Sequence, residues 1–329
     1  MITRRSLLIA LGAGALAPRL SFAQQPAAKV WRIGFLGAST AASFAARLET
    51  LRTALRELGY EAGRNVNYEL RWADNELGRL PDLAGELVRA KCDVIVTSGT
   101  PAILALKRAT TAIPIVMASS GDAIKYGLVA SMARPGGNVT GLSFFAPELY
   151  AKRLSLIKEA LPRVKSIAYL VNPDNPVTRL GGYASLGETA ARQLKVTVHM
   201  METRNLNEIE AVFASTAAPR VDAVVIGNDS LFITHQKKIA ALATRRGMAS
   251  IGVVEFAADG GLIGFGQNSL DLYRRSAVFV DKILKGANPA NLPIEQPTAF
   301  ETELNMKTAK ALGIKFPQSI LVQATRVIE

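Results

Sequence analysis

Short apolar runs alternate with amphipathic helical patterns along most of this chain, and this alternation restricts its fold more than any other feature. The runs are nearly continuous in Val, Ile and Leu, without a polar residue at every second position. Between two of the runs, apolar residues recur at steps of four and three, at Phe44, Leu48, Leu51, Leu55 and Leu58. Such spacing indicates one buried helix face. The order predicts an α/β fold with parallel sheets covered by helices on both faces.

The pattern restarts near the middle of the chain. Strands are expected in the first half at 30–36, 66–70, 93–97, 113–117 and 139–144, with one helix at 77–90. In the second half, strands are expected at 166–171, 196–200, 221–226 and 249–254, and helices at 177–194, 206–218 and 231–245. A chain of 329 residues is long enough for two domains of about 150 residues. We therefore predict two doubly wound parallel-sheet lobes.

The tail indicates how the two lobes are connected. It contains a strand at 262–266, a helix at 272–284, a strand at 298–304 and a short helix at 306–312. One further strand–helix unit followed by one further strand fits a chain that returns to the first lobe and then crosses back. The prediction is a three-segment hinge. The N-terminal lobe would comprise 29–143 plus 265–298, and the C-terminal lobe 144–264 plus 299–329.

The first 23 residues are expected to be an export signal. Arg4 and Arg5 precede an apolar run over 7–17, and small residues at Ser21 and Ala23 mark a cleavage site. The run is too short to cross a hydrocarbon core of roughly 30 Å. The paired arginines followed by leucines resemble the twin-arginine motif, with an ordinary signal peptide as the alternative. Cleavage near Ala23 would leave a soluble periplasmic protein.

The net charge of +12 would suit nucleic acid, an anionic membrane or an acidic ligand. Arg4, Arg5 and Arg19 belong to the signal, which has no acidic residue, so the mature chain would keep +9. We expect no nucleic-acid binding, because no helix-turn-helix precedes the first strand and aromatic residues make up only 6% of the chain. The single cysteine, Cys92, excludes a disulfide framework and a Cys-based zinc site.

The usual catalytic and cofactor motifs are absent from the sequence. No Gly-x-Gly-x-x-Gly follows the first strand, and there is no Walker loop and no Gly-x-Ser-x-Gly. The two histidines, His199 and His235, lack metal-ligand spacing and are expected to be structural or solvated. We therefore predict no catalysis, no cofactor and no metal.

Polar residues follow the expected strands, where parallel sheets bind their ligands. In the first half these candidates are Ser39, Thr40, Ser98, Thr100, Ser119 and Asp122. In the second half they are Asn172, Asn175, Asp229 and Glu255. Hydroxyls at helix starts favour an anion such as a carboxylate, whereas carboxylates suit an ammonium or a hydroxylated ligand. Together the two sets predict a cleft that holds a zwitterion such as an amino acid.

Structural roles are the alternative for several of these residues. Thr100 and Asn175 each precede a proline, as ordinary helix N-caps do. Asp229 would cap the following helix, and Glu255 would be a solvated side chain. The aromatic residues weighed as stacking partners for a ligand, with a core position as the alternative, are Phe145, Phe232 and Phe256.

Several segments, in this order and spacing, resemble one family over almost the whole mature chain. They are 33–37, 55–60 with 63–66 and 71–73, Thr100-Pro101-Ala102, 133–142 (ARPGGNVTGL), 280–286, 292–298 and 307–313. The chain resembles the periplasmic substrate-binding proteins of ABC transporters, of the type associated with tryptophan and tyrosine uptake. It departs from the family at Gly121-Asp122-Ala123, where Gly-Asp-Pro is frequent.

The resemblance implies a type I periplasmic-binding fold that closes two lobes on a small polar solute, either an amino acid or an aromatic or carboxylate solute. It also implies transient docking to an ABC permease in the inner membrane, and we expect a monomer. An exported ligand-sensing module that signals to a membrane receptor or kinase remains the alternative. An exported two-lobed α/β enzyme is a third possibility.

Overall fold

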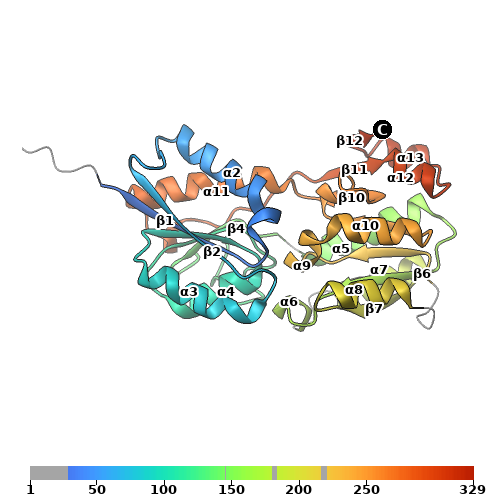
Figure 1. Ribbon diagram of the computed structural model, residues 1–329, viewed down its shortest axis with the longest axis horizontal. Helices are drawn as coiled ribbons and strands as arrows, with labels where there is room; N and C mark the ends of the chain where they lie inside the picture. Colours follow the sequence, from blue (N-terminus) through green and yellow to red (C-terminus); the bar gives the residue numbers. More distant parts are fainter. Residues whose placement is uncertain (1–28, 145, 180–183, 216–220) are drawn as a thin grey trace, which may run out of the picture. The chain divides into compact units, whose positions relative to one another are not determined.

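The first lobe contains a five-stranded parallel sheet with the order β2-β1-β3-β4-β5 (Figure 1). The structure is a computed structural model that describes residues 29–144, 146–179, 184–215 and 221–329. The strands of this sheet are β1 (Trp31–Gly37), β2 (Val66–Trp72), β3 (Val94–Ser98), β4 (Ile115–Ser119) and β5 (Val139–Gly141). The central strands are almost wholly buried, as the continuous apolar runs predicted.

Helices cover both faces of the first sheet. On one face, α2 (Ala41–Glu57) packs beside α11 (Ser269–Leu284), which comes from far along the chain (Figure 1). The other face carries the short 3-10 helix η1 (Leu77–Arg79), α3 (Leu80–Arg89) and α4 (Thr100–Ala109). The apolar face predicted for α2 is buried at Phe44, Leu48, Leu51 and Leu55. Leu58, the last member of that pattern, follows the helix and is 39% exposed.

The second lobe contains a seven-stranded sheet with the order β12-β11-β10-β9-β8-β6-β7. Its strands are β6 (Ser166–Val171), β7 (Thr197–Glu202), β8 (Ala223–Ile226), β9 (Ala249–Gly252), β10 (Ile263–Gly266), β11 (Glu301–Asn305) and β12 (Arg326–Ile328). Its strand pairs are parallel except for β10 and β11, which are antiparallel. The predicted parallel-sheet lobe is therefore confirmed, with this one antiparallel pair added near its edge. The edge strand β12 was not predicted, because three residues are too few to show a pattern.

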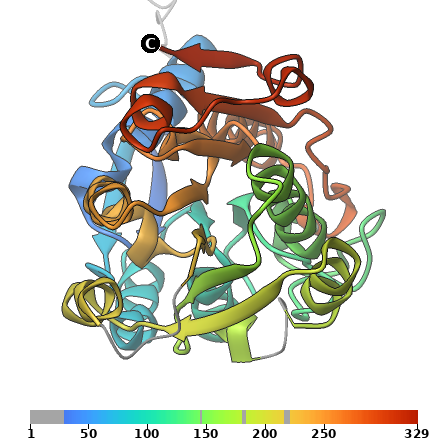
Figure 2. The same ribbon diagram turned by 90° about the vertical axis from the view of Figure 1, so that its right-hand side faces the viewer.

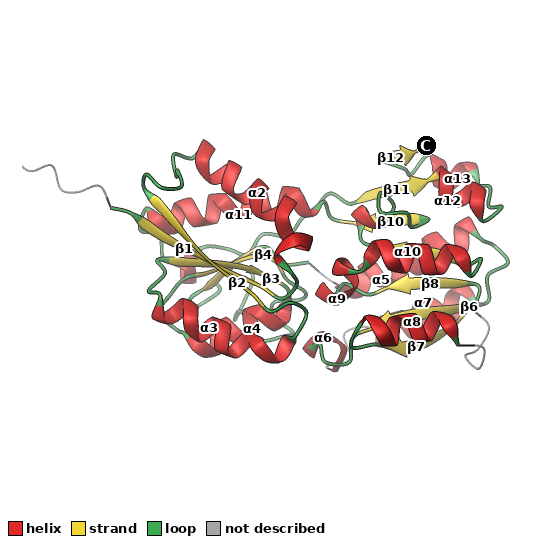
Figure 3. Cartoon of the chain, in the orientation of Figure 1, coloured by secondary structure: helices red, strands yellow, loops and turns green. Residues whose placement is uncertain are grey.

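Figures 2 and 3 show the helices of the second lobe, of which the one expected over 206–218 ends at Ala214. They are α5 (Ala146–Ala160), α6 (Pro176–Arg179), α7 (Ala184–Leu194), α8 (Leu206–Ala214), α9 (Ser230–Thr234), α10 (Gln236–Arg245), η2 (Val254–Phe256), α12 (Met306–Ala311) and α13 (Gln318–Leu321). The single helix expected over 231–245 is divided at His235, which leaves helical geometry with φ −106°. The buried cluster under α8, α9 and α10 includes Phe232 and Phe256.

Three connections join the lobes, after β5, after β10 and after the 3-10 helix η3 (Pro289–Asn291). The strand β10 continues to Gly266, two residues beyond the predicted lobe boundary at 264. The first and third connections run beside each other, because Leu142 and Glu295 form a parallel bridge. The backbone N–H of Ser143 donates to the carbonyl of Glu295 at 3.0 Å. Residues Trp31–Glu329, with both sheets, form one unit of the chain.

The predicted signal over residues 1–23, with its cleavage point, lies outside the described residues. Within the ranges that the structure describes, we find no helix with both the length and the apolar character needed to cross a membrane.

Candidate functional site

A cavity of about 150 Å³ lies where the carboxyl ends of the strands of both lobes meet, and both lobes line it. The first lobe contributes the residues that follow β3 and β4, and the second lobe those that follow β8, β9 and β10. An apolar cavity of about 150 Å³ is large enough to bind benzene. The volume therefore suits a small solute.

The first lobe presents the start of α4 to this cavity. Gly99 has φ +81°, which a glycine adopts without strain, and it brings Ser98 and Thr100 to the cavity wall. Thr100 is only 2% exposed, and its Oγ1 has no hydrogen-bond partner among the described residues. The first N–H groups of a helix also lack partners within that helix. This wall is suited to an anionic oxygen such as that of a carboxylate.

The second lobe presents a buried carboxylate, Asp229, which is 6% exposed. Its oxygens accept hydrogen bonds from Nδ2 of Asn175 at 2.7 Å, from the backbone N–H of Leu231 at 2.9 Å and from Nδ2 of Asn172 at 3.3 Å. Burial raises the pKa of Asp229 above its ordinary value, and these three hydrogen bonds oppose the rise.

The Asp229 carboxylate has room for a cationic donor. An ionised carboxylate offers about four acceptor positions, of which three are occupied here. None of the described lysine, arginine or histidine side chains forms an ion pair with it. A ligand ammonium would supply both the missing hydrogen bond and the missing positive charge.

A polar network joins the lobes at the rim of the same cavity. Arg47 of α2 donates through Nε to Oγ of Ser269 at 3.0 Å, and Ser269 donates to Oε1 of Glu255. The guanidinium of Arg47 also lies 3.7 Å from that Glu255 oxygen. A second link runs from the hydroxyl of Thr234 to Oδ1 of Asn75 at 3.1 Å. These contacts tie the first lobe to the η2 and α9 segments of the second.

Aromatic side chains form one wall of the cavity. Phe44 and Tyr273 line it, with their ring centroids 5.8 Å apart and their planes nearly perpendicular. Phe35 and Trp72 extend the cluster behind them, with centroids 5.7 and 5.6 Å from that of Phe44. Edge-to-face packing of this kind is favourable and fixes the orientation of the rings. The wall offers a ligand ring an apolar, pre-positioned surface.

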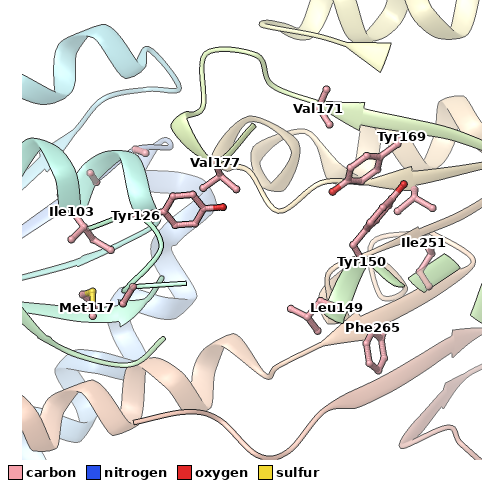
Figure 4. Close-up of a cluster of buried hydrophobic side chains, with 14 of the residues drawn as sticks. Ile103, Met117, Tyr126, Leu149, Tyr150, Tyr169, Val171, Val177, Ile251 and Phe265 are labelled. Atoms are coloured by element: carbon pink, nitrogen blue, oxygen red, sulfur yellow. The ribbon is translucent and has the colours of Figure 1, made fainter. Parts of the chain in front are cut away.

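An apolar contact also links the lobes beside the cavity. Figure 4 shows Tyr126 of the first lobe next to Val177 of the second, and both belong to one buried cluster. Tyr126 is 6% exposed and Val177 also 6%. The two lobes are thus held together by side-chain packing as well as by polar contacts.

The structure brings together six of the ten residues proposed from the sequence. The residues of this group, which all line the cavity, are Ser98, Thr100, Ser119, Asn175, Asp229 and Glu255. Their contact with a solute stays a prediction.

The other four proposed residues are not among those that line the cavity. Thr40 caps α2 by accepting from the N–H of Ser43 at 3.3 Å, and Ser39 is wholly buried. Asp122 accepts from the N–H groups of Ile124 and Lys125 within its own turn. Asn172 acts behind the wall, where it supports Asp229.

Several cavity residues were not identified from the sequence. Arg153 of α5 is 3% exposed and donates to Oδ1 of Asn228 at 2.7 Å and to the carbonyls of Phe265 and Ile226. Arg47, Gln267 and Tyr273 also line the cavity. Two signals were available. Arg47 is a charged residue one turn after Phe44 on the apolar face of a helix, and Gln267 directly follows the strand expected at 262–266.

Two of the three aromatic candidates, Phe232 and Phe256, do not line the cavity. Phe232 and Phe256 are each 1% exposed and belong to the core of the second lobe, the alternative weighed for them. Phe145 lies outside the described residues. Across the described ranges, no group of three or more His, Cys, Asp or Glu side chains is arranged to hold a metal ion.

The Tyr273→Phe variant should unfold about 1 kcal/mol more easily than the wild type. The hydroxyl of the fully buried Tyr273 donates to Oγ of Ser98 at 2.6 Å, and the variant leaves that oxygen without this partner. Urea unfolding measures the change. Tyr68→Phe is the control, because the Tyr68 hydroxyl forms no hydrogen bond with any described residue. Equal effects of the two changes would contradict the assigned role of this bond.

Known proteins share both the sequence pattern and the architecture of this chain. An ABC domain from Streptococcus pneumonia, solved in complex with L-Trp, is 27% identical, with a TM-score of 0.80, and the match covers 91% of this chain and 100% of that chain. A conserved domain protein from Vibrio cholerae o1 biovar eltor is 25% identical, with a TM-score of 0.82 and the same coverage. The likeness confirms the predicted type I periplasmic-binding fold.

A curated relative and a family model agree with this result. The tyrosine-binding protein of Clostridioides difficile (strain R20291) is 25% identical over 263 residues, which are 80% of this chain and 75% of that protein. A model of the ABC transporter substrate binding protein family matches residues 40–328. The chain therefore belongs to the family of ABC transporter substrate-binding proteins.

Proposed function

We propose that this protein is the exported receptor of an ABC uptake system and that its solute is an amino acid with an aromatic side chain. One observation carries the proposal. Asp229 and Thr100 line one cavity from opposite lobes; the buried Asp229 carboxylate has no cationic partner among the described residues, and the Thr100 hydroxyl has no hydrogen-bond partner among them. The first suits an ammonium group, and the second, with the start of α4, suits a carboxylate.

The cavity walls and the relatives support the same class of solute. Phe44 and Tyr273 offer ring surfaces beside the polar groups. The Clostridioides difficile relative is named as tyrosine-binding, and the Streptococcus pneumonia domain was solved with L-Trp. A zwitterion with an aromatic ring matches the charges and the walls together.

Binding would favour the closed arrangement of the lobes. A solute held by Asp229 on one side and by the start of α4 on the other contacts both walls only when the lobes meet. The contact between Arg47 and Glu255 also joins the two lobes. A ligand with this differential affinity shifts the population toward closure. The closed receptor would then dock to a membrane permease as a monomer, after export, and would perform no catalysis.

A thermal-shift screen tests the proposed function. The panel contains the twenty amino acids, aromatic acids without an ammonium group, aromatic amines without a carboxylate, and polyols. At 100 times its dissociation constant, a true ligand adds about 2.7 kcal/mol to the free energy of unfolding. We expect this shift for aromatic amino acids only. The aromatic acids and the aromatic amines should not stabilise the protein, because each leaves either Asp229 or the start of α4 without a charged partner.

Calorimetry on the hits gives the stoichiometry and the dissociation constant. Stabilisation by a polyol or by an aromatic acid, with no response to any amino acid, would overturn the proposal. Such a result would not change the assignment of the chain to its family or to its fold.

A further inference from the structure

The hydroxyl of Thr234 bonds to the opposite lobe instead of to its own helix. Thr234 is the last residue of α9, and its Oγ1 lies 3.1 Å from Oδ1 of Asn75 and 3.3 Å from Oγ of Ser43, both in the first lobe. A helical threonine can bond the carbonyl of its own preceding turn, as Thr50 of α2 does with Ala46 at 2.9 Å. The Thr234 hydroxyl has a single proton to donate, and the nearer of its two acceptors is Asn75.

The Asn75 acceptor is held in place by its own lobe. Asp74 and Asn75 are consecutive residues with φ +54° and +69°, a left-handed conformation in which asparagine and aspartate are the usual residues other than glycine. The N–H of Asn75 donates to the carbonyl of Ala38 at 2.9 Å, and Asp74 forms an ion pair with Arg79 at 2.8 Å. Backbone strain of this kind clusters at functional sites, where it pre-positions a group. The turn therefore presents its acceptor without help from the second lobe.

The contact between Thr234 and Asn75 lies outside the ligand cavity. Neither residue is among the described residues that line the cavity, and Ser43 is not among them either. Thr234 and Asn75 are both half-buried, so their bond is partly shielded from water. A change confined to the Thr234 hydroxyl leaves the cavity walls in place. Any effect of that change on solute binding must therefore act through the arrangement of the lobes.

This contact is also remote from the connections about which the lobes would rotate. A parallel bridge joins the first connection to the third, and Nδ2 of Asn268 in the second donates to Glu301 at the end of the third at 3.1 Å. The first connection follows β5, whereas Asn75 follows β2, and these strands are the two opposite edges of the first sheet. A rotation about the connections displaces the far edge more than the near one. Lobe opening therefore breaks the bond between Thr234 and Asn75.

We infer that Thr234 is a positioning residue, whose hydrogen bond to Asn75 forms a latch between the lobes that slows the release of a bound solute. This inference rests on the proposed function, in which the lobes close on a solute. A contact that exists only while the lobes are together stabilises that arrangement, whichever solute occupies the cavity. The latch therefore determines how long the receptor holds its solute, and not which solute it selects.

Stopped-flow measurement of ligand release tests the latch, with L-tryptophan and L-tyrosine as the probes. Thr234→Val keeps the shape of the side chain and removes the hydroxyl. A bound probe should leave this variant about fivefold faster than the wild type, which must break one additional hydrogen bond to open. The association rate should not change. Thr234→Ser keeps the hydroxyl and should release the probe at the wild-type rate. Thr50→Val, the same change at a bond within one helix, is the matched control and should alter neither rate.

A variant of the acceptor shows whether the hydroxyl acts through Asn75. Asn75→Gly removes the Oδ1 acceptor and adopts the left-handed turn without strain, so it should also release the probe faster than the wild type. The double variant should release it no faster than Thr234→Val alone, because both changes break the same bond. Additive effects of the two changes would overturn the pairing of Thr234 with Asn75.

The outcomes separate the latch from the proposed function. Small-angle scattering of the unliganded proteins is the second readout, and Thr234→Val should be more extended than the wild type. If neither probe binds the wild type, the proposed solute is wrong, and the latch is judged by scattering alone. A release rate and a scattering profile that both match the wild type would overturn the latch and leave the proposed function standing. Slower association without faster release would also overturn it, because the change would then act on the cavity wall.

Discussion

The variant Asp229→Asn should bind the amino-acid ligand at least about 30-fold more weakly than the wild type. Loss of one partner from a buried, hydrogen-bonded charge pair costs about 2–5 kcal/mol, and each 1.4 kcal/mol corresponds to a factor of ten. Asparagine keeps the shape of the side chain but removes the negative charge that would hold the ammonium. Isothermal calorimetry measures the change. Asp82→Asn on the exposed start of α3 is the matched control and should leave the affinity unaltered.

The unliganded Asp229→Asn variant should keep the wild-type stability within about 1 kcal/mol. The variant loses the acceptor for Asn175, but it no longer buries an unpaired charge. An alanine would be a poorer test, because it removes the acceptors for Leu231, Asn172 and Asn175 together. A large loss of stability in the asparagine variant would show that Asp229 supports the fold rather than the ligand.

In the wild type, both the stability and the ligand affinity should depend on pH through the protonation of Asp229. Because burial raises the pKa of Asp229, the folded protein holds that proton more tightly than the unfolded chain. Unliganded stability therefore falls as the pH rises from the ordinary aspartate pKa through the raised one. Affinity changes in the opposite direction, since a protonated Asp229 cannot pair with an ammonium. Both effects should vanish in Asp229→Asn, and their persistence there would assign them to another group.

Gly264→Ala should destabilise the protein by about 3 kcal/mol. A Cβ at this position of β10 would lie 2.0 Å from the carbonyl oxygen of Val254 and 3.1 Å from that of Val253. These are backbone atoms of the turn that carries Glu255. The clash with the added Cβ can therefore be removed only if the η2 segment moves away from the sheet. Urea unfolding should show a lower midpoint with an unchanged slope. Ligand affinity should fall as well, because Val253 and Glu255 line the cavity.

Gly266→Ala provides a matched control in the same strand. Gly266 lies two residues after Gly264, so a Cβ added there would point to the same face of the sheet. The nearest atom to that Cβ would be Nη2 of Arg153, at 3.7 Å. That distance is an ordinary contact, so the stability should change by less than about 1 kcal/mol. Equal effects of the two substitutions would show that the loss reflects glycine in a strand rather than the close approach of η2.

The layout of the fold was predictable because buried parallel strands and amphipathic helices leave a strong local pattern. The strand at Ser166–Val171 was predicted to the residue, since it is apolar and lies between clear turns. The break at His235 left no local signal, and neither did the reversal at β11. Both depend on which distant segment each residue packs against, and local periodicity does not record that.

The candidate site was predictable only where it follows strand ends. Asp229 and Thr100 could be chosen because the carboxyl ends of parallel strands meet at one edge. Tyr273 could not, because it enters the cavity from a helix, whereas Gln267 directly follows the strand expected at 262–266 and was missed although the same rule selects it. Ser39 and Asp122 follow strands as well, yet their positions belong to the core and to a local turn.

The path of the chain through three connections also determines when the protein can fold during synthesis. The first sheet lacks one covering helix until α11, Ser269–Leu284, has left the ribosome. The second sheet lacks two strands until the chain has reached Ile328. The N-terminal lobe therefore gains its full covering layer only late in synthesis, although its strands precede those of the second lobe. Translation that stops before Ser269 leaves the first sheet without α11 and the second without β11 and β12, so both lobes are completed by segments from the last quarter of the chain.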